Sequence, residues 1–211
     1  MSDLSVPQLK PAADGWCLPG AQVEALAAAY AAPPRAYHNF DHVQAVLRHY
    51  HDIALAPGWR QPREIYLALC YHDAIYLPGR SDNEARSAEF ARGEWARVGL
   101  QTEVDIERVA QLILMTARHG KLERPAVDAE AALFLDADMA IVGSDAAAFD
   151  RYDAAVAEEY RALVPAFIYR FKRKHFLREL LASPRIFLSD YGHARWDAPA
   201  RDNLRRALSA A

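Results

Sequence analysis

The spacing of apolar residues is the feature that most restricts how this chain can fold. Through most of the sequence they recur at three- and four-residue intervals, as in Val23, Leu26, Ala27 and Tyr30, and this spacing places them on one face of an α-helix. Alternation of apolar and polar residues, which is typical of a half-buried strand, is nowhere sustained, and residues 185–188 are the one short strand candidate. We therefore expect an all-α protein.

Prolines, glycines and capping residues divide the chain into successive helices. Asn39 and Asp145 are suited to cap helices through their side-chain oxygens, as is Ser81 or Asp82, and Pro62 is suited to a first helical turn. The predicted helices cover residues 23–32, 40–56, 62–76, 83–98, 102–119, 129–141, 145–163, 165–181 and 198–210.

The length and composition favour one helical domain. With 211 residues and 52% apolar residues, the chain can bury a core of useful size. Residues 1–20 are rich in proline and glycine and show no periodicity, so we expect an irregular lead-in there. Residues 21–211 are then expected to form a single-domain helical bundle, since no repeat or low-complexity tract divides them.

Charge and hydropathy exclude several classes of partner. A net charge of -3 argues against a surface for a nucleic-acid polymer, and no apolar stretch is long enough to predict a membrane span. The N-terminal residues lack the basic start and apolar stretch of a signal peptide. Cys17 and Cys70 show no metal or redox spacing. We expect a cytoplasmic protein, with a homodimer among the options for its oligomeric state.

The pair His72-Asp73 is the most informative candidate for chemistry. It directly follows the apolar run Ile65–Tyr71, and burial of an imidazole and a carboxylate costs several kcal/mol unless a partner or a cation compensates. A metal ion would compensate. The competing interpretation is a hydrogen-bonded core histidine beside a surface or capping carboxylate. Taken without the rest of the sequence, the His72-Asp73 pair favours this competing interpretation over a metal site.

Two further segments carry buried residues of metal-ligand type. His38 and His42 lie four residues apart near a predicted helix start, where side chains at this spacing share a face if both are helical. Asp136 and Asp138 lie within an apolar helical run, and isolated buried carboxylates are rare. These two carboxylates are separated by about 200° around a helix, so they are not expected to face the same ion.

The order of these residues along the chain resembles the HD superfamily of metal-dependent phosphohydrolases, in particular its bacterial predicted HD-domain phosphohydrolase branch. The resemblance covers roughly residues 20–208 and extends to three other motifs: Tyr37-His38-Asn39, the group Asp82-Asn83-Glu84 with Ser87, and Ala200-Arg201-Asp202-Asn203-Leu204. It implies an HD-type helical domain and makes His42, His72, Asp73 and Asp138 the metal ligands. Asp136 is the rival for the last position; Asp138 is preferred because its sequence context is the more similar to that of the family's terminal ligand.

The resemblance implies metal-dependent hydrolysis of a phosphate ester, either a monoester or a diester, in a small phosphorylated molecule, with nucleotides among the candidates. Mixed histidine and carboxylate ligands suit a divalent Mn, Fe, Co, Ni or Zn ion, which lowers the pKa of a bound water. Asp73 would both bind the ion and orient the attacking water. The alternatives are a metal- and nucleotide-binding regulatory module with little turnover, and an oxygenase with two iron ions.

Four other residues are candidates for roles around the ion, each with a competing structural interpretation. His38 is a candidate for substrate binding or for a structural hydrogen bond. Glu84 and His119 are candidate acid–base groups; the competing interpretation places each at a helix end, Glu84 at the start and His119 at the finish. Arg173, in a basic run from Arg170 to Lys174, is a candidate phosphate-binding residue or part of a solvated helix face.

Overall fold

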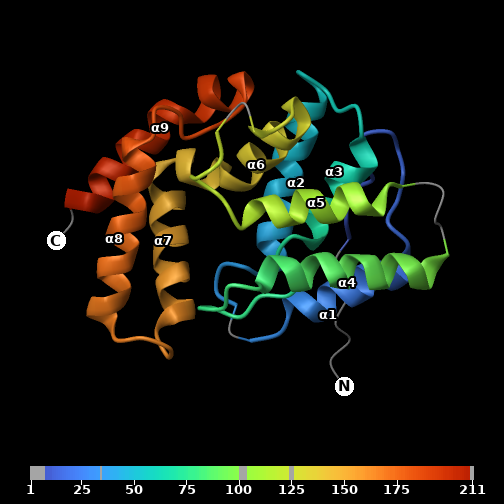
Figure 1. The fold of residues 1–211 in the computed structure, drawn as a ribbon, viewed down its shortest axis with the longest axis horizontal. Helices are drawn as coiled ribbons and strands as arrows, with labels where there is room; N and C mark the ends of the chain where they lie inside the picture. Colours follow the sequence, from blue (N-terminus) through green and yellow to red (C-terminus); the bar gives the residue numbers. More distant parts are fainter. Residues whose placement is uncertain (1–7, 34, 100–103, 124–125, 210–211) are drawn as a thin grey trace. The chain divides into compact units, whose positions relative to one another are not determined.

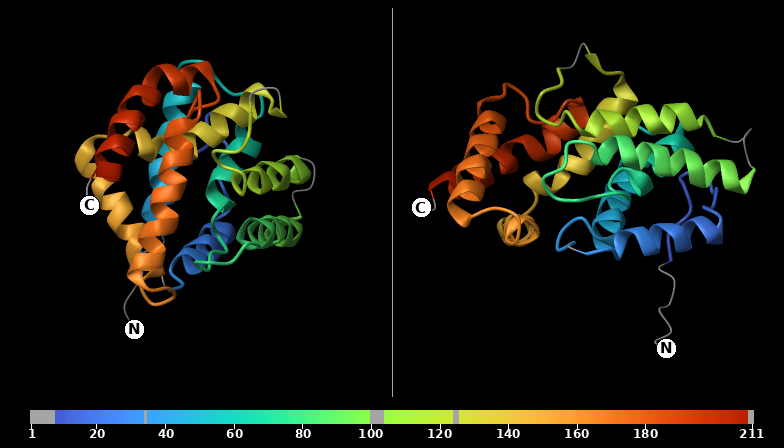
Figure 2. Two further views of the ribbon diagram at one scale, coloured as in Figure 1. Left: turned by 60° about the vertical axis from the view of Figure 1, so that its left-hand side comes forward. Right: turned by 60° about the horizontal axis from the view of Figure 1, so that its bottom comes forward.

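A computed structural model describes residues 8–33, 35–99, 104–123 and 126–209. Its chain contacts divide it into two compact units, residues 1–117 and 118–211, which Figures 1 and 2 show from three sides. All regular structure in the described ranges is helical, which confirms the all-α prediction. The first unit contains α1 (Gly20–Tyr30), α2 (Phe40–Ala54), α3 (Pro62–Tyr71), α4 (Asn83–Val98) and α5 (Ile106–Thr116).

Helix α3 is the centre of the first unit. It packs against α2, α4 and α5, and each of its residues from Ile65 to Tyr71 is at most 2% exposed. Pro62 occupies its first turn, as expected, where a missing N–H costs no hydrogen bond. The Tyr30 hydroxyl at the end of α1 donates to the Cys70 carbonyl over 3.0 Å. A helix buried on all sides in this way places its C-terminal end inside the protein.

The second unit contains α6 (Ala129–Met139), the short 3₁₀ helix η2 (Ala140–Gly143), α7 (Ala146–Tyr160), α8 (Ala166–Ala182) and α9 (Asp190–Ser209). Helix α9 packs against η2, α8 and α6, while α7 and α8 run side by side as a hairpin (Figures 1 and 2). The approach of α9 to η2 requires glycine at position 143, because a Cβ there would lie 2.6 Å from Trp196 Cβ.

A buried carboxylate on α6 fixes the start of α9. Asp136 Oδ1 accepts from the Leu188 amide, and its Oδ2 accepts from the amide and the hydroxyl of Ser189, all within 2.7 Å. Ser189 in turn caps α9 by accepting from the Gly192 amide. Burial raises the pKa of Asp136 to about 6, although these hydrogen bonds act to lower it. Both carboxylate oxygens of Asp136 are therefore engaged in hydrogen bonds that hold the start of α9 in place.

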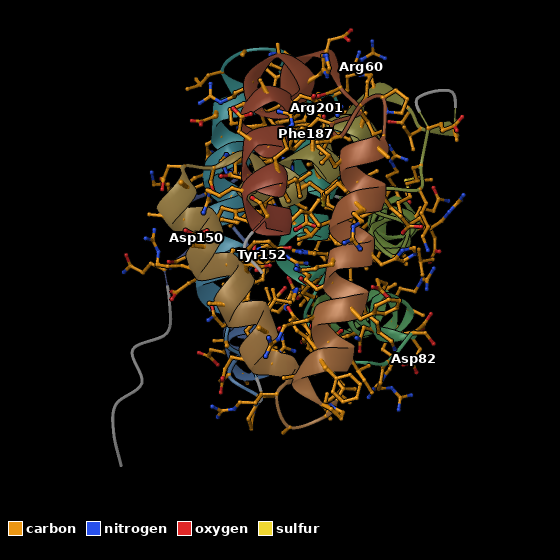
Figure 3. All side chains as sticks on the ribbon, turned by 90° about the vertical axis from the view of Figure 1, so that its left-hand side faces the viewer. Arg60, Asp82, Asp150, Tyr152, Phe187 and Arg201 are labelled. Carbon is orange, nitrogen blue, oxygen red and sulfur yellow. The ribbon has the colours of Figure 1, made fainter. Side chains whose placement is uncertain are left out.

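A second carboxylate holds the segment between α8 and α9. Asp197, on α9, accepts from the Ile186 amide over 2.9 Å and from Arg201 Nε over 2.6 Å. Arg201 also donates to the carbonyls of Leu181 and Ser183; Figure 3 labels Arg201 together with Phe187 of this segment. Asn203 donates to the carbonyls of Val142 and Ser144. The motif around Arg201 thus closes a polar network in the second unit.

Several boundaries differ from the prediction. Helix α3 ends at Tyr71 and α5 at Thr116, earlier than expected, while α9 begins at Asp190, before the expected residue 198. The strand candidate, residues 185–188, forms bends rather than a strand. The expected start at Thr102 lies outside the described residues, and α5 is capped instead by Asp105, which accepts from the amides of Glu107 and Arg108. The capping predictions for Asn39 and Asp145 are confirmed.

Membrane-spanning helices are absent from the described ranges, where no helix combines the required length with the required hydropathy. The longest helix, α9, has 20 residues and repeated charged side chains.

Two glycine substitutions are expected to have opposite effects on stability. A Cβ at Gly192 would lie 2.8 Å from Asp136 Cγ, so Gly192→Ala should displace the carboxylate that holds α9 and lower the free energy of unfolding by about 1–3 kcal/mol. Gly93, inside α4, has no atom within 4 Å of an added Cβ, so Gly93→Ala should be neutral or stabilising by up to about 1 kcal/mol. Urea denaturation measures both, and equal effects would contradict this packing.

Asp197→Asn should lower stability in a pH-dependent way. Burial acts to raise the pKa of Asp197, but the Ile186 amide and Arg201 outweigh it and hold this pKa below its usual value. A lowered pKa stabilises the folded state above the unfolded pKa of about 3.9 and loses that effect as the pH falls through the folded value. The variant should lose about 1–3 kcal/mol at pH 7.

Thermal unfolding of both proteins at pH 7, 5, 4 and 3 would check this prediction. The difference between wild type and Asp197→Asn should be nearly constant from pH 7 to pH 5 and should narrow below about pH 4, where the wild-type carboxylate also becomes protonated. A difference that widens toward acid pH would show that the pKa of Asp197 is raised rather than lowered.

Candidate metal centre

Helix α2 supplies the first candidate ligand. Asn39 caps the helix by accepting from the Asp41 amide over 2.9 Å, which places His42 in the first turn. The His42 side chain is 3% exposed, and its ring lies 4.8 Å from that of Tyr37. The helix begins just before His42, so the cap fixes the backbone from which this imidazole projects into the first unit.

The end of α3 supplies the second ligand and fixes its orientation. His72 is the C-cap residue, is 1% exposed, and its Nδ1 lies 2.9 Å from the Leu69 carbonyl. A carbonyl only accepts, so this contact assigns the proton to Nδ1 and leaves the lone pair on Nε2. The imidazole therefore satisfies one of the last carbonyls of α3 with one nitrogen and presents the other as a metal ligand.

Three potential ligand atoms converge within the first unit. His42 Nε2 lies 3.1 Å from His72 Nε2, while Asp73 Oδ2 lies 3.1 Å from His72 Nε2 and 3.6 Å from His42 Nε2. Two atoms bound at about 2.1 Å to one ion are about 3.0–3.4 Å apart at octahedral to tetrahedral angles. The triangle is thus close to one face of a coordination sphere, and this unit brings together three of the predicted ligands.

Arg35 joins the two segments that carry these ligands. Its Nη1 donates to the carbonyls of His38 and Asp73, and its Nη2 donates to the Ala74 carbonyl, each over 2.8 Å. The guanidinium also lies 5.0 Å from the centre of the Tyr30 ring. These contacts attach the segment before α2 to the turn after α3, so Arg35 sets the separation of His42 from the His72-Asp73 pair.

Helix α4 holds the continuation of the same turn. The Ser87 hydroxyl accepts from the Ile75 amide and donates to the Ile75 carbonyl, at 3.0 and 3.1 Å. Asn83 pairs with both the amide and the carbonyl of Leu77 at 3.0 Å. The residues that accompany the predicted ligands in the Asp82-Asn83-Glu84 and Ser87 motif thus fix the chain that leaves Asp73.

His38 and Glu84 have different surroundings. The His38 ring stacks on the Tyr76 ring, with 4.0 Å between centres, and lies 6.0 Å from the His42 ring. Its ring thus lies beside a candidate ligand, and its role in substrate binding stays a prediction. Glu84 is half-buried in the first turn of α4, the helix-start position of the competing interpretation. Asp82 supplies no side-chain cap there and pairs with Arg80 instead.

Three other predicted site residues belong to the second unit. His119 lies in the turn after α5 rather than at its end, and its Nε2 is 2.7 Å from Asp138 Oδ2. Both carboxylate oxygens of Asp136, the rival for the last ligand position, accept hydrogen bonds from the backbone amides of Leu188 and Ser189. Asp138 as a fourth ligand of the ion stays a prediction from the sequence.

Arg173 is held in place by its own helix hairpin. Its Nε donates to Asp153 Oδ1 over 2.8 Å, and its guanidinium lies 5.0 Å from the centre of the Tyr152 ring. The side chain is 12% exposed. It is therefore a buried, paired cation rather than part of a solvated face, and its predicted contact with a substrate phosphate stays a prediction.

Arg35 is the important residue that sequence reasoning missed. It follows two prolines in a segment with no helical periodicity, and its Nη1 and Nη2 atoms donate to the backbone carbonyls of His38, Asp73 and Ala74. A side chain that bonds to backbone carbonyls needs no particular side chain as its partner. The sequence therefore contains no complementary residue from which its role could be predicted. Its proximity to the Tyr37-His38-Asn39 motif is the only signal that points to it.

The chain was compared with models of protein families, with curated proteins and with solved structures. None of the three comparisons finds a match. The geometry of the centre and the resemblance of its motifs are therefore what the functional assignment rests on.

Proposed function

We propose that His42, His72 and Asp73 hold a divalent transition-metal ion and that this ion serves the hydrolysis of a phosphate ester in a small molecule. The observation that carries the proposal is the triangle of two imidazole nitrogens and one carboxylate oxygen with sides of 3.1, 3.1 and 3.6 Å. Nitrogen and carboxylate donors suit Mn²⁺, Fe²⁺, Co²⁺, Ni²⁺ or Zn²⁺, whereas a site for Mg²⁺ or Ca²⁺ is built mainly from oxygen.

Three protein ligands on one face of a coordination sphere leave other positions for water and substrate. An ion bound there would polarise a phosphoryl oxygen and supply hydroxide near neutral pH. Asp73 is the most accessible of the three, with a side chain 16% exposed against 3% and 1% for His42 and His72. We assign to its carboxylate the orientation of the attacking water, while the two imidazoles hold the position of the site.

The aromatic residues beside the centre suit a substrate with a flat or apolar part. The rings of Tyr37 and His38 lie 4.8 and 6.0 Å from the His42 ring, and Tyr76 stacks on His38. Nucleotides are one class of phosphate ester with such a part, and they are the first substrates to test. Both cysteines are free thiols, which accords with the cytoplasmic location that we include in the proposal.

The competing function is a metal-binding regulatory module with little turnover, and the centre by itself fits either function because both need the same ligands. A measurement of phosphate release distinguishes the hydrolase from the regulatory module. Bound metal and bound nucleotide without hydrolysis, over a broad panel of phosphomonoesters and phosphodiesters, would favour the module and contradict the proposed reaction.

Substitution of His72 tests the centre directly. His72→Ala should lower the affinity for Mn²⁺, Co²⁺ or Ni²⁺ by more than about 100-fold, because even residues that only support a ligand typically contribute 10- to 100-fold. It should also abolish phosphate release. Metal titration by calorimetry, elemental analysis and a phosphatase panel measure these effects.

The control for His72→Ala is His175→Ala, which removes a histidine that is 67% exposed on α8 and should change neither quantity. Wild-type protein that takes up no stoichiometric metal would overturn the proposal. In that case a proton shared between the two Nε2 atoms, rather than an ion, would account for their 3.1 Å separation.

Substitution of Arg35 tests how the ligands are positioned. Arg35→Ala removes the hydrogen bonds of Arg35 that join the two ligand-bearing segments and should weaken metal binding by about 10- to 100-fold without removing any ligand. Arg35→Lys should recover only part of this loss, because an ammonium does not reproduce the planar fork of the guanidinium. The matched control is Arg48→Ala, an exposed arginine on α2, and equal metal affinities for the two alanine variants would contradict the positioning role.

A further inference from the structure

A cavity in the second unit is independent of the metal centre. It has a volume of about 610 Å³ and lies between α7, α8 and the last turns of α9. Figure 3 shows α7 with Asp150 and Tyr152 labelled, and Asp150 is one of the lining residues. The volume is within the range of about 300–1,000 Å³ that is usual for sites that bind small molecules.

The interior of this cavity is apolar and partly aromatic. Phe149 and Leu177 line it and are 1% and 3% exposed. Tyr160 and Tyr169 add a wall of two rings whose centres are 5.6 Å apart. Ala154 and Ala157, also among the lining residues, leave space on the α7 side because their side chains end at Cβ. The cavity therefore offers room and apolar surface to the body of a ligand.

Most charges that line the cavity are paired with one another. Arg173 bonds to Asp153 over 2.8 Å, Arg206 to Asp150 over 2.6 Å, and Arg161 to Glu158 over 2.7 Å. Each pair joins one cation to one carboxylate. Together these pairs contribute no net charge to the cavity, so its electrostatic character is decided by the remaining charged side chains.

The remaining charged side chains are both positive. Arg170 and Lys174 line the cavity from α8, four residues apart and therefore on the same face. Neither forms an ion pair or a hydrogen bond with any residue in the part of the chain that the structure describes. The cavity therefore carries an excess of two positive charges beside its apolar interior.

We propose that this cavity binds a small amphipathic anion, with the apolar body between α7 and α8 and the anionic head at Arg170 and Lys174. The site is separate from the proposed hydrolytic function and does not depend on it. A carboxylate, phosphate or sulfonate head provides the acceptor oxygens that a guanidinium and an ammonium bind best. An uncharged ligand of the same shape would leave the two cations without a partner.

The amphipathic anion accounts for more of these features than a protein partner does. Phe167 and Phe171, each 73% exposed, also project from α8, and a partner protein would use such exposed rings. Neither ring lines the cavity. The volume of the cavity, the buried Phe149 and Leu177, and the two unpaired cations are all features of a site for a small charged molecule.

Two probes test the proposal with the full chain. The fluorescent anion 8-anilinonaphthalene-1-sulfonate should bind with a stoichiometry of one, and decanoate should displace it. Decanol, which has the same apolar chain without the charge, should displace the dye about tenfold less well, a difference that corresponds to the loss of one good charged contact. Equal displacement by decanol and decanoate would overturn the role of the cations.

Charge reversal identifies the site. The double variant R170E/K174E should weaken the binding of dye and decanoate by about tenfold or more. The matched control is K172E/R178E, which makes the same change of charge at two exposed positions of α8 that do not line the cavity, and it should bind within about twofold of wild type. Binding that is equally weakened in both double variants would show that only the net charge matters.

Two further variants locate the apolar part. Ala157→Trp should fill the cavity and abolish binding, and thermal unfolding verifies that the variant is folded. F167S/F171S should leave binding unchanged. Loss of binding in this variant together with full binding in R170E/K174E would assign the dye to the exposed rings of α8 and overturn the proposal.

Discussion

The burial of α3 on all sides is the constraint on which the first unit depends. The final carbonyls of a helix have no partner within the helix, and when the end is buried water does not supply one. Here the protein supplies them: His72 Nδ1 donates to the Leu69 carbonyl and the Tyr30 hydroxyl to the Cys70 carbonyl. The turn beyond is held by Arg35 through the carbonyls of Asp73 and Ala74. The His72 imidazole at the candidate metal centre thus also satisfies a backbone carbonyl near the end of α3.

In the second unit, two carboxylates and a side-chain amide bond to backbone groups near the ends of helices. Asp136 holds the start of α9, Asp197 holds the preceding segment, and Asn203 holds the carbonyls at the end of η2. Each of these residues is at most 6% exposed, and each side chain is bonded to backbone. These three buried polar residues are thus partners for main chain, and a chemical role for a residue of this kind requires further geometric support.

That distinction explains what the sequence could and could not predict. Helical periodicity located most helices, because a helix that buries one face must repeat apolar residues every three or four positions. The start of α9 was placed too late because Pro199, inside the helix, is a residue typical of helix starts, and because the Asp136 contacts that fix the true start come from another helix. The structure brings together His42, His72 and Asp73, which the order of residues in the sequence groups as candidate ligands, and their role as metal ligands stays a prediction.

Arg35 and Asp136 act through hydrogen bonds to backbone groups that are distant in sequence, and a single sequence does not show which backbone groups a side chain will contact. The same holds for the cavity of the second unit, which exists because α7 and α8 lie side by side. The basic run from Arg170 to Lys174 was visible in the sequence, but only the structure shows which of its members are paired and which are not.

The contacts of Arg35 have a consequence for how this centre could change over time. The guanidinium nitrogens of Arg35 bond to carbonyl oxygens of His38, Asp73 and Ala74. These hydrogen bonds hold the two ligand-bearing backbone segments together and do not depend on which side chains those three positions carry. A different donor at position 73, such as histidine or glutamate, would leave these bonds in place and alter the preference for one ion over another. The hydrogen bonds of Arg35 would therefore keep the backbone of the site in place while a substitution at position 73 changes which metal ion the site prefers.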